Sequence, residues 1–148
     1  MVEKIVSELL LCKRTDKEGV SVETLTLSDI LVVAPYNVQV RLLKQALGPQ
    51  ARVGTVDKFQ GQQAPVVILS MCSSAGDASS RGIDFLFDKN RLNVAISRAE
   101  SLAIIVGNPM LASSRCTSLK HLELTNLYCR IINEGDVTEE PMALKQST

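Results

Sequence analysis

Four short apolar runs stand out along this 148-residue chain, and turn residues or polar stretches bound each of them. The runs are rich in β-branched and aliphatic side chains and show little alternation with polar residues. Such runs are typical of strands that are buried on both faces of a parallel sheet. The pattern therefore predicts strands at ILVVA (30–34), RVGTV (52–56), VVILS (66–70) and LAIIV (102–106).

Helical periodicity separates and flanks these runs. Apolar residues recur every three or four positions, which gives each segment one apolar stripe that can face a core. Helices are predicted at residues 2–11, at residues 88–99 with Asp88 as cap, and at residues 119–132. A further helix carries Val40, Leu43 and Leu47 on one stripe and ends at Gly48 and Pro49.

Strands that alternate with helices predict an α/β fold of three layers around a mainly parallel sheet. Residues 1–29 are expected to form a helix and a polar connector of the same domain, and residues 30–134 its main lobe. Residues 135–148 lack an apolar period and are predicted to be a flexible tail. The small, polar segment 72–82 is predicted to be a mobile loop.

Composition narrows the classes of function. Lys and Arg together number 16, as do Asp and Glu, so the overall charge does not indicate a polyanionic partner. Between residues 37 and 120, however, ten basic residues stand against five acidic ones. On count alone, a scatter of solvated surface charges is the better explanation of this excess.

Cysteine and histidine usage argues against a metal site. Cys12, Cys72, Cys116 and Cys129 form no CxxC pair, and His121 has no companion at ligand spacing. We expect free, buried thiols in a reducing compartment. The N-terminus lacks a basic leader, and no apolar run approaches the ~18 residues of a membrane span, so a cytoplasmic protein without membrane contact is expected.

Polar segments follow three of the predicted strands: APYNVQV (34–40), GTVDKFQGQQ (54–63) and GNP (107–109). Ligands of parallel α/β sheets bind beyond the carboxyl ends of the strands, where such loops collect. Arg91 and Arg98 lie seven residues apart on one predicted helix, so their guanidinium groups would share one face and could bind phosphate. Taken singly, a helical Arg is usually solvated and Gln-Gly is usually a turn, so spacing alone leaves the function open.

The segments APYNVQV, GTVDKFQGQQAPVVILS and NRLNVAISRAESLAIIVGNP, in this order, resemble motifs IV, V and VI of superfamily 1 helicases. The nearest group is that of the nonsense-mediated-decay RNA helicase and the nuclease-helicases of DNA replication and repair. The resemblance covers positions 30–112. It implies that the chain is the second, C-terminal RecA-like lobe of such a motor, from a bacterial member of the group.

In such motors ATP and Mg²⁺ bind in a cleft between two RecA-like lobes, and the first lobe holds most of both. The resemblance assigns Arg98 as the catalytic arginine finger. It assigns nucleotide contacts to Tyr36, Gln60, Gly61, Gln63, Arg91 and Arg98, with an edge role in the core as the rival for Tyr36. It assigns contacts with single-stranded DNA or RNA to Pro35, Asn37, Gln39 and Thr55.

The chain has no GxxxxGK[ST] phosphate loop, so we expect it not to hydrolyse ATP alone and to work as part of a longer polypeptide with a first lobe. Whether a RecB-like nuclease is fused to it, as in bacterial relatives, stays open. Gln63 stands where many relatives have Glu, so weaker nucleotide binding is expected. Val40 stands where some relatives have Arg. Two alternatives are a stand-alone nucleic-acid or protein binding module without motor activity, and a small nucleotide-binding regulatory domain.

Overall fold

The computed structural model describes residues 1–15, 18–71, 89–108 and 119–135. Its centre is a four-stranded sheet in the order β4-β3-β5-β6, and every neighbouring pair is parallel. This sheet confirms the predicted α/β class and all four predicted strands. The strands are β3 (Ile30–Val33), β4 (Arg52–Gly54), β5 (Ala64–Met71) and β6 (Ala99–Gly107).

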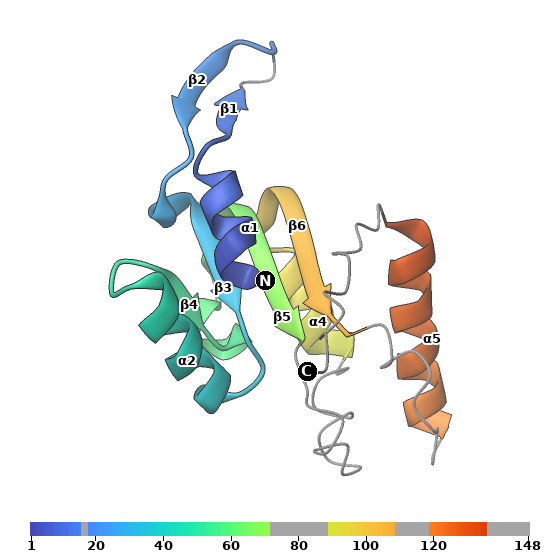
Figure 1. Ribbon diagram of the computed structural model, residues 1–148. Coiled ribbons are helices and arrows are strands. Elements are labelled where there is room, and N and C mark those ends of the chain that lie inside the picture. Colours follow the sequence, from blue (N-terminus) through green and yellow to red (C-terminus); the bar gives the residue numbers. More distant parts are fainter. Residues whose placement is uncertain (16–17, 72–88, 109–118, 136–148) are drawn as a thin grey trace, which may run out of the picture.

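Helices cover both faces of the sheet and make three layers (Figure 1). One face packs against α1 (Val2–Leu9) and α2 (Asn37–Leu47). The other packs against η2 (Val56–Phe59), a short 3₁₀ helix, and against α4 (Lys89–Ile96) and α5 (Leu119–Glu134). The helices predicted before Gly48 and at 119–132 are therefore confirmed, and α1 is two residues shorter than predicted.

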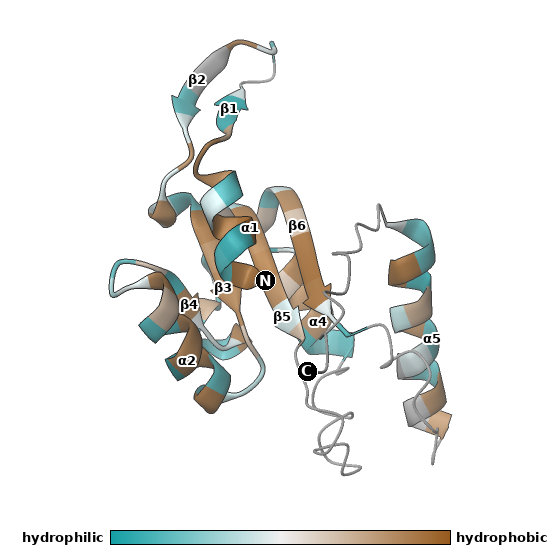
Figure 2. Cartoon of the chain, in the orientation of Figure 1, coloured by the Kyte–Doolittle hydropathy of each residue, from teal (hydrophilic) through white to brown (hydrophobic). Residues whose placement is uncertain are grey.

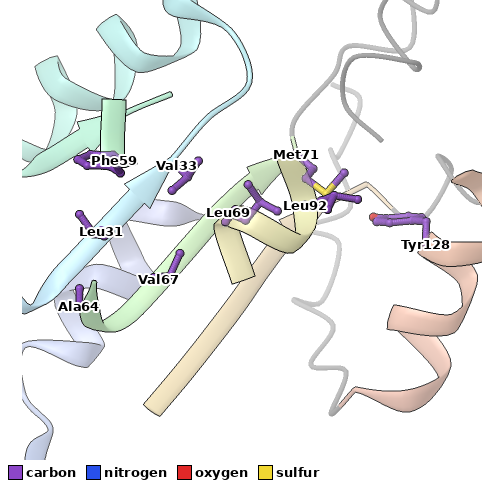
Figure 3. Close-up of a cluster of buried hydrophobic side chains, with 10 residues drawn as sticks. Leu31, Val33, Phe59, Ala64, Val67, Leu69, Met71, Leu92 and Tyr128 are labelled. Carbon is purple, nitrogen blue, oxygen red and sulfur yellow. The ribbon is translucent and has the colours of Figure 1, made fainter. Parts of the chain in front are cut away.

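Alternating side chains of the strands divide the core in two. Ile30, Val32 and Ile68 face the layer of α1 and α2, while Leu31, Val33 and Leu69 face the layer of η2, α4 and α5. Both β3 and β5 are buried along their whole length, and Figure 2 shows their hydrophobic character. In Figure 3, Leu92 of α4 lies beside Leu69 and Met71 of β5.

The predicted polar connector between α1 and β3 contains an antiparallel hairpin of β1 (Lys13–Thr15) and β2 (Ser21–Thr24), followed by the short 3₁₀ helix η1 (Leu27–Asp29). The connector prediction was therefore incomplete. Arg14 pairs with Glu23 across the hairpin, an opposite-charge pair of the kind that stabilises adjacent strands. All of β1 is exposed, so it has no buried face and no apolar alternation by which the sequence could reveal it.

The helix predicted at 88–99 ends at Ile96, so Arg98 lies in a turn and not on the helix. Hydrogen bonding explains the early end. The carbonyl of Arg98 accepts from the N–H of Ala64 at 3.0 Å, and Ala64 then pairs with Ala99 in the parallel ladder. The cap Asp88, the loop 72–82 and the tail beyond residue 135 lie outside the described residues.

Cys12 and Cys129 are free thiols, but neither is fully buried, and Cys12 is exposed. Its expected burial was wrong because Cys12 follows the last turn of α1 on the outer side, where its thiol meets the carbonyl of Glu8 at 3.5 Å. Cys72 and Cys116 lie outside the described part of the chain. Within that part, no helix is both long and apolar enough to cross a bilayer.

Candidate functional site

A groove runs between η2 and α4 on one face of the sheet. Its lining residues are Val56, Asp57 and Gln60 on one side and Asn90, Arg91, Val94 and Arg98 on the other. In a 3₁₀ helix residues three apart project from the same side, which is why Asp57 and Gln60 both face the groove. The groove therefore brings together two arginines, one carboxylate and one amide.

Gly54 allows η2 to fold back tightly on the end of β4. A Cβ atom at this position would lie 2.6 Å from Cδ of Lys58 and 3.0 Å from Cε2 of Phe59. The ring of Phe59 is 3% exposed and anchors η2 in the core, where Figure 3 shows it near Val33. Gly61 then turns the chain with a φ of 78°, in the left-handed region that favours glycine. These two glycines set the path of the segment that carries Gln60.

Arg98 reaches the groove from a fixed backbone. Its N–H donates to the carbonyl of Ala95 at 3.2 Å, and its own carbonyl holds the start of β5. Its side chain is half-buried, and its Nε atom is buried without a hydrogen-bond partner among the described residues. An unsatisfied buried donor costs about 1–3 kcal/mol, so this guanidinium would gain from an anionic acceptor.

Arg91 and Asp57 bridge the groove. The Nη2 atom of Arg91 lies 3.8 Å from Oδ2 of Asp57, with the two side chains 36% and 72% exposed. An ion pair this exposed contributes about 0–1 kcal/mol, so a competing anion can displace it. A phosphate in the groove could therefore replace Asp57 beside Arg91.

A second hollow lies at the carboxyl edge of the sheet and is lined by Pro35, Thr55, Val56, Leu69, Met71, Arg91 and Leu92. Val56 and Arg91 line both hollows, so the two are contiguous. Pro35 and Thr55 follow the ends of β3 and β4, which are neighbours in the sheet. Parallel pairing therefore brings these two residues together, although they lie 20 positions apart in the sequence.

Residues 1–110 match the model of a family described as AAA domain. The chain belongs to this AAA domain family. The match spans the described strands and both hollows. Together with the sheet order, it makes this a RecA-like α/β domain, as the sequence predicted.

Curated relatives of this AAA domain are helicases. The chain is 41% identical over 83 residues to the DNA polymerase alpha-associated DNA helicase A of Schizosaccharomyces pombe, which covers 54% of the chain and 12% of that protein. It is 37% identical over 108 residues to an ATP-dependent helicase of Caenorhabditis elegans, covering 72% and 6%. It is 39% identical over 89 residues to the human RNA helicase Mov10l1, covering 55% and 7%.

These relatives support the superfamily 1 helicase resemblance and make the chain a helicase-family domain. The chain spans only a small part of each relative's length, so their whole-protein activities are not transferred to it by similarity alone. One of these relatives is named as a DNA helicase and another as an RNA helicase.

The AAA domain separates the predicted ligand residues into two groups. Gln60, Gly61 and Gln63 are exposed just before β5, at the amino end of the strands, and Arg98 lies at the same end because its carbonyl holds Ala64. The sequence placed all the loops at the carboxyl ends. The difference arises because η2 descends from the end of β4 to the start of β5 and carries the Gln-Gly turn with it.

At the carboxyl edge, Asn37 is exposed in the first turn of α2, but Gln39 points to the sheet. The Nε2 atom of Gln39 donates to Oγ of Ser70 at 2.8 Å, so this amide already holds α2 on β5. Tyr36 is half-buried and packs on the core beside η2, and its carbonyl accepts the first helical hydrogen bond from Val40. Tyr36 is therefore placed as an edge residue of the core.

The third predicted loop is covered by a helix. The hydroxyl of Tyr128 on α5 donates to the carbonyl of Asn108 at 3.3 Å and packs so closely on Gly107 that a Cβ there would clash with it. Among the described residues, Gly107 and Asn108 therefore serve the docking of α5. Pro109 lies outside them.

Sequence reasoning missed Asp57 and the pair Arg52 and Gln62. The guanidinium of Arg52 donates to the carbonyl of Ser28 at 2.7 Å and to Oε1 of Gln62 at 3.0 Å, which ties η1 to the Gln-Gly turn. One signal for Asp57 was present, since it is the only acidic residue of GTVDKFQGQQ. No cluster of three metal-ligating side chains occurs in the described ranges.

Proposed function

We propose that this chain is the C-terminal motor lobe of an ATP-dependent helicase, facing a first RecA-like lobe of the same polypeptide across a nucleotide cleft. The observation that carries the proposal is the half-buried Arg98 in a groove with Arg91 and Gln60, with a buried Nε that has no acceptor among the described residues. The family match and the helicase relatives support the same reading.

The groove fits a phosphate chain better than a metal ion. Mg²⁺ takes oxygen ligands in octahedral geometry, and this groove offers a single carboxylate, Asp57, which already faces Arg91. Two guanidinium groups are, by contrast, suited to phosphate oxygens. ATP would then meet Arg98, Arg91 and Gln60 on this side, with the metal and the phosphate loop on the other lobe.

Arg98 would act as the arginine finger. Bound ATP supplies the phosphoryl group that is transferred to water, and charge develops on its oxygens during transfer. The guanidinium of Arg98 donates hydrogen bonds to that charge from a backbone that the β5–β6 ladder already fixes. Fixed donors of this kind accelerate phosphoryl transfer by about 10³- to 10⁵-fold.

Pro35 and Thr55 would contact the single strand at the carboxyl edge. The hollow that they line is contiguous with the groove through Val56 and Arg91. Closure of the two lobes at the groove would therefore shift the contacts with the nucleic-acid strand, because one helical turn of η2 connects the two places. Cycles of closure and opening would move the lobe along the strand.

The test is the Arg98→Ala variant of the full-length protein. We expect ATP turnover to fall by about 10³-fold or more with unchanged thermal unfolding, because the finger acts on the transition state and its Nε makes no hydrogen bond within the described part of the chain. Arg98→Lys keeps the charge and should recover only part of the rate, because it lacks the planar fork.

The matched control is Arg130→Ala, an exposed arginine that pairs with Glu134 within α5. Its turnover should equal that of the unsubstituted protein. Turnover that survives in Arg98→Ala would remove the finger assignment, while the family and the fold would stand.

A further inference from the structure

Gln62 holds the Gln-Gly turn, residues 60–63, by three hydrogen bonds. Its backbone N–H donates to the carbonyl of Phe59 at 3.0 Å. In its side chain, Oε1 accepts from Nη2 of Arg52 at 3.0 Å, and Nε2 donates to the carbonyl of Lys58 at 3.5 Å. Gln62 lines neither hollow, whereas Gln60, two positions earlier, lines the groove. The same turn therefore has one glutamine that anchors it and one that can meet a ligand.

Arg52 ties this anchor to the sheet. It is the first residue of β4 and pairs with Leu31 of β3, so its backbone lies at the amino end of the strands, where η2 brings the turn. Its half-buried guanidinium also donates from Nη1 to the carbonyl of Ser28 at 2.7 Å. Because a guanidinium is planar and rigid, its two donors fix the turn relative to η1.

The turn has few other constraints. All four of its residues are exposed, and Gly61 adds the conformational freedom of glycine. The backbone N–H of Gln60 reaches the carbonyl of Asp57 only at 3.4 Å, the long end of the hydrogen-bond range. A side chain on such a segment loses conformational freedom when it binds a ligand, and an anchor nearby reduces that cost. The hydrogen bond of Arg52 to Gln62 is thus placed to preorganise Gln60.

We propose that Arg52 is a positioning residue for the nucleotide: through Gln62 it holds the turn so that the amide of Gln60 faces the groove. Arg52 lines neither hollow and acts without touching the ligand. The inference rests on the proposed function, because it assumes that ATP meets Gln60. It adds the source of that contact's geometry.

The experiment measures KM and kcat for ATP in the full-length protein and its variants. Arg52→Gln and Gln62→Leu should each raise KM by about three- to tenfold, the range that one hydrogen bond is worth. Their kcat should change by less than about twofold, because the β5–β6 ladder holds the backbone of Arg98 separately. Gln62→Glu keeps an acceptor for Arg52 and should keep KM close to that of the unsubstituted protein.

A double variant tests whether Gln62 acts through Gln60. Gln60→Ala should raise KM, and Gln60→Ala/Gln62→Leu should raise it no further, because an anchor has no effect once the residue that it positions is gone. The matched control is Gln45→Leu, which replaces an exposed glutamine of α2 and should leave KM unchanged. Thermal unfolding is measured on every variant, since a merely structural anchor would lower the melting temperature and leave KM as it was.

The outcomes separate this inference from the proposed function. If Gln60→Ala leaves KM unchanged, the nucleotide contact at Gln60 fails, and the role of Arg52 fails with it. If Gln60→Ala raises KM but Arg52→Gln and Gln62→Leu do not, only the role of Arg52 fails. Additive losses in the double variant, or an equal loss in Gln45→Leu, would also overturn that role and leave the nucleotide groove in place.

Discussion

At the scale of single residues, the candidate site depends on what each polar side chain already contacts. Gln39 and Gln62 were two of several similar amides in the sequence, yet their contacts differ: Gln39 donates to Ser70, and Gln62 accepts from Arg52. Gln60 instead lines the groove with Arg98. The polar segment 54–63 therefore combines residues that shape the turn with residues that can reach a ligand.

Asp57 is the carboxylate among the residues that line the groove. Because it faces Arg91 across the groove in a weak, exposed pair, it competes with phosphate for that guanidinium. In the full-length protein, Asp57→Asn should lower the KM for ATP by about two- to fivefold, the equivalent of an ion pair worth ~0.5–1 kcal/mol. The effect should shrink as salt rises.

Steady-state kinetics at two ionic strengths measure this change, and Glu100→Gln, an exposed carboxylate of β6, is the control. A higher KM in Asp57→Asn would show the opposite role, namely that Asp57 holds Arg91 in its binding position.

At the scale of elements, local contacts outside the apolar pattern decide where segments begin and end. The carboxylate of Asp29 accepts from the backbone N–H of Thr26 at 2.8 Å and from its hydroxyl at 2.7 Å, which closes η1 before β3. These hydrogen bonds lower the pKa of Asp29 below its ordinary value. A carboxyl group whose pKa is lowered in the folded state stabilises the fold at pH values above its ordinary pKa. This stability is lost as pH falls through the lowered pKa.

We therefore expect Asp29→Asn to reduce the free energy of unfolding by about 1 kcal/mol at neutral pH, the usual worth of a cap. The deficit should shrink as pH falls through the lowered pKa of Asp29, because the carboxyl group of the unsubstituted protein is then also protonated. Urea unfolding at pH 7 and at low pH measures both. A deficit that is the same at both pH values would mean that packing of the side chain, and not its charge, closes η1.

At the scale of the whole molecule, the sheet could be predicted because its strands are buried on both faces. Ile30 to Val33 are all buried, and such a run has few readings other than a central strand. The exposed hairpin β1–β2 carries no such signal. The turn at Arg98 was missed because the sequence continues helically, and only the pairing of Ala64 with Ala99 across 35 positions ends α4. The Gln-Gly turn lies at the amino end because η2 leads from the end of β4 to the start of β5.

In the proposed motor, catalysis needs residues of both lobes. The groove holds cations that can stabilise a developing charge, but the sequence has no phosphate loop to position the nucleotide and no described cluster of oxygen ligands for Mg²⁺. An arginine finger lowers the barrier only for a phosphoryl group that is already oriented. The isolated 148-residue chain should therefore hydrolyse ATP at less than about 10⁻³ of the rate of the full-length protein, with or without single-stranded nucleic acid.

A phosphate-release assay on both proteins measures this, and Arg98→Ala should change the rate of the full-length protein alone. Turnover by the isolated chain that is sensitive to Arg98 would mean that this lobe contains a complete catalytic site of its own.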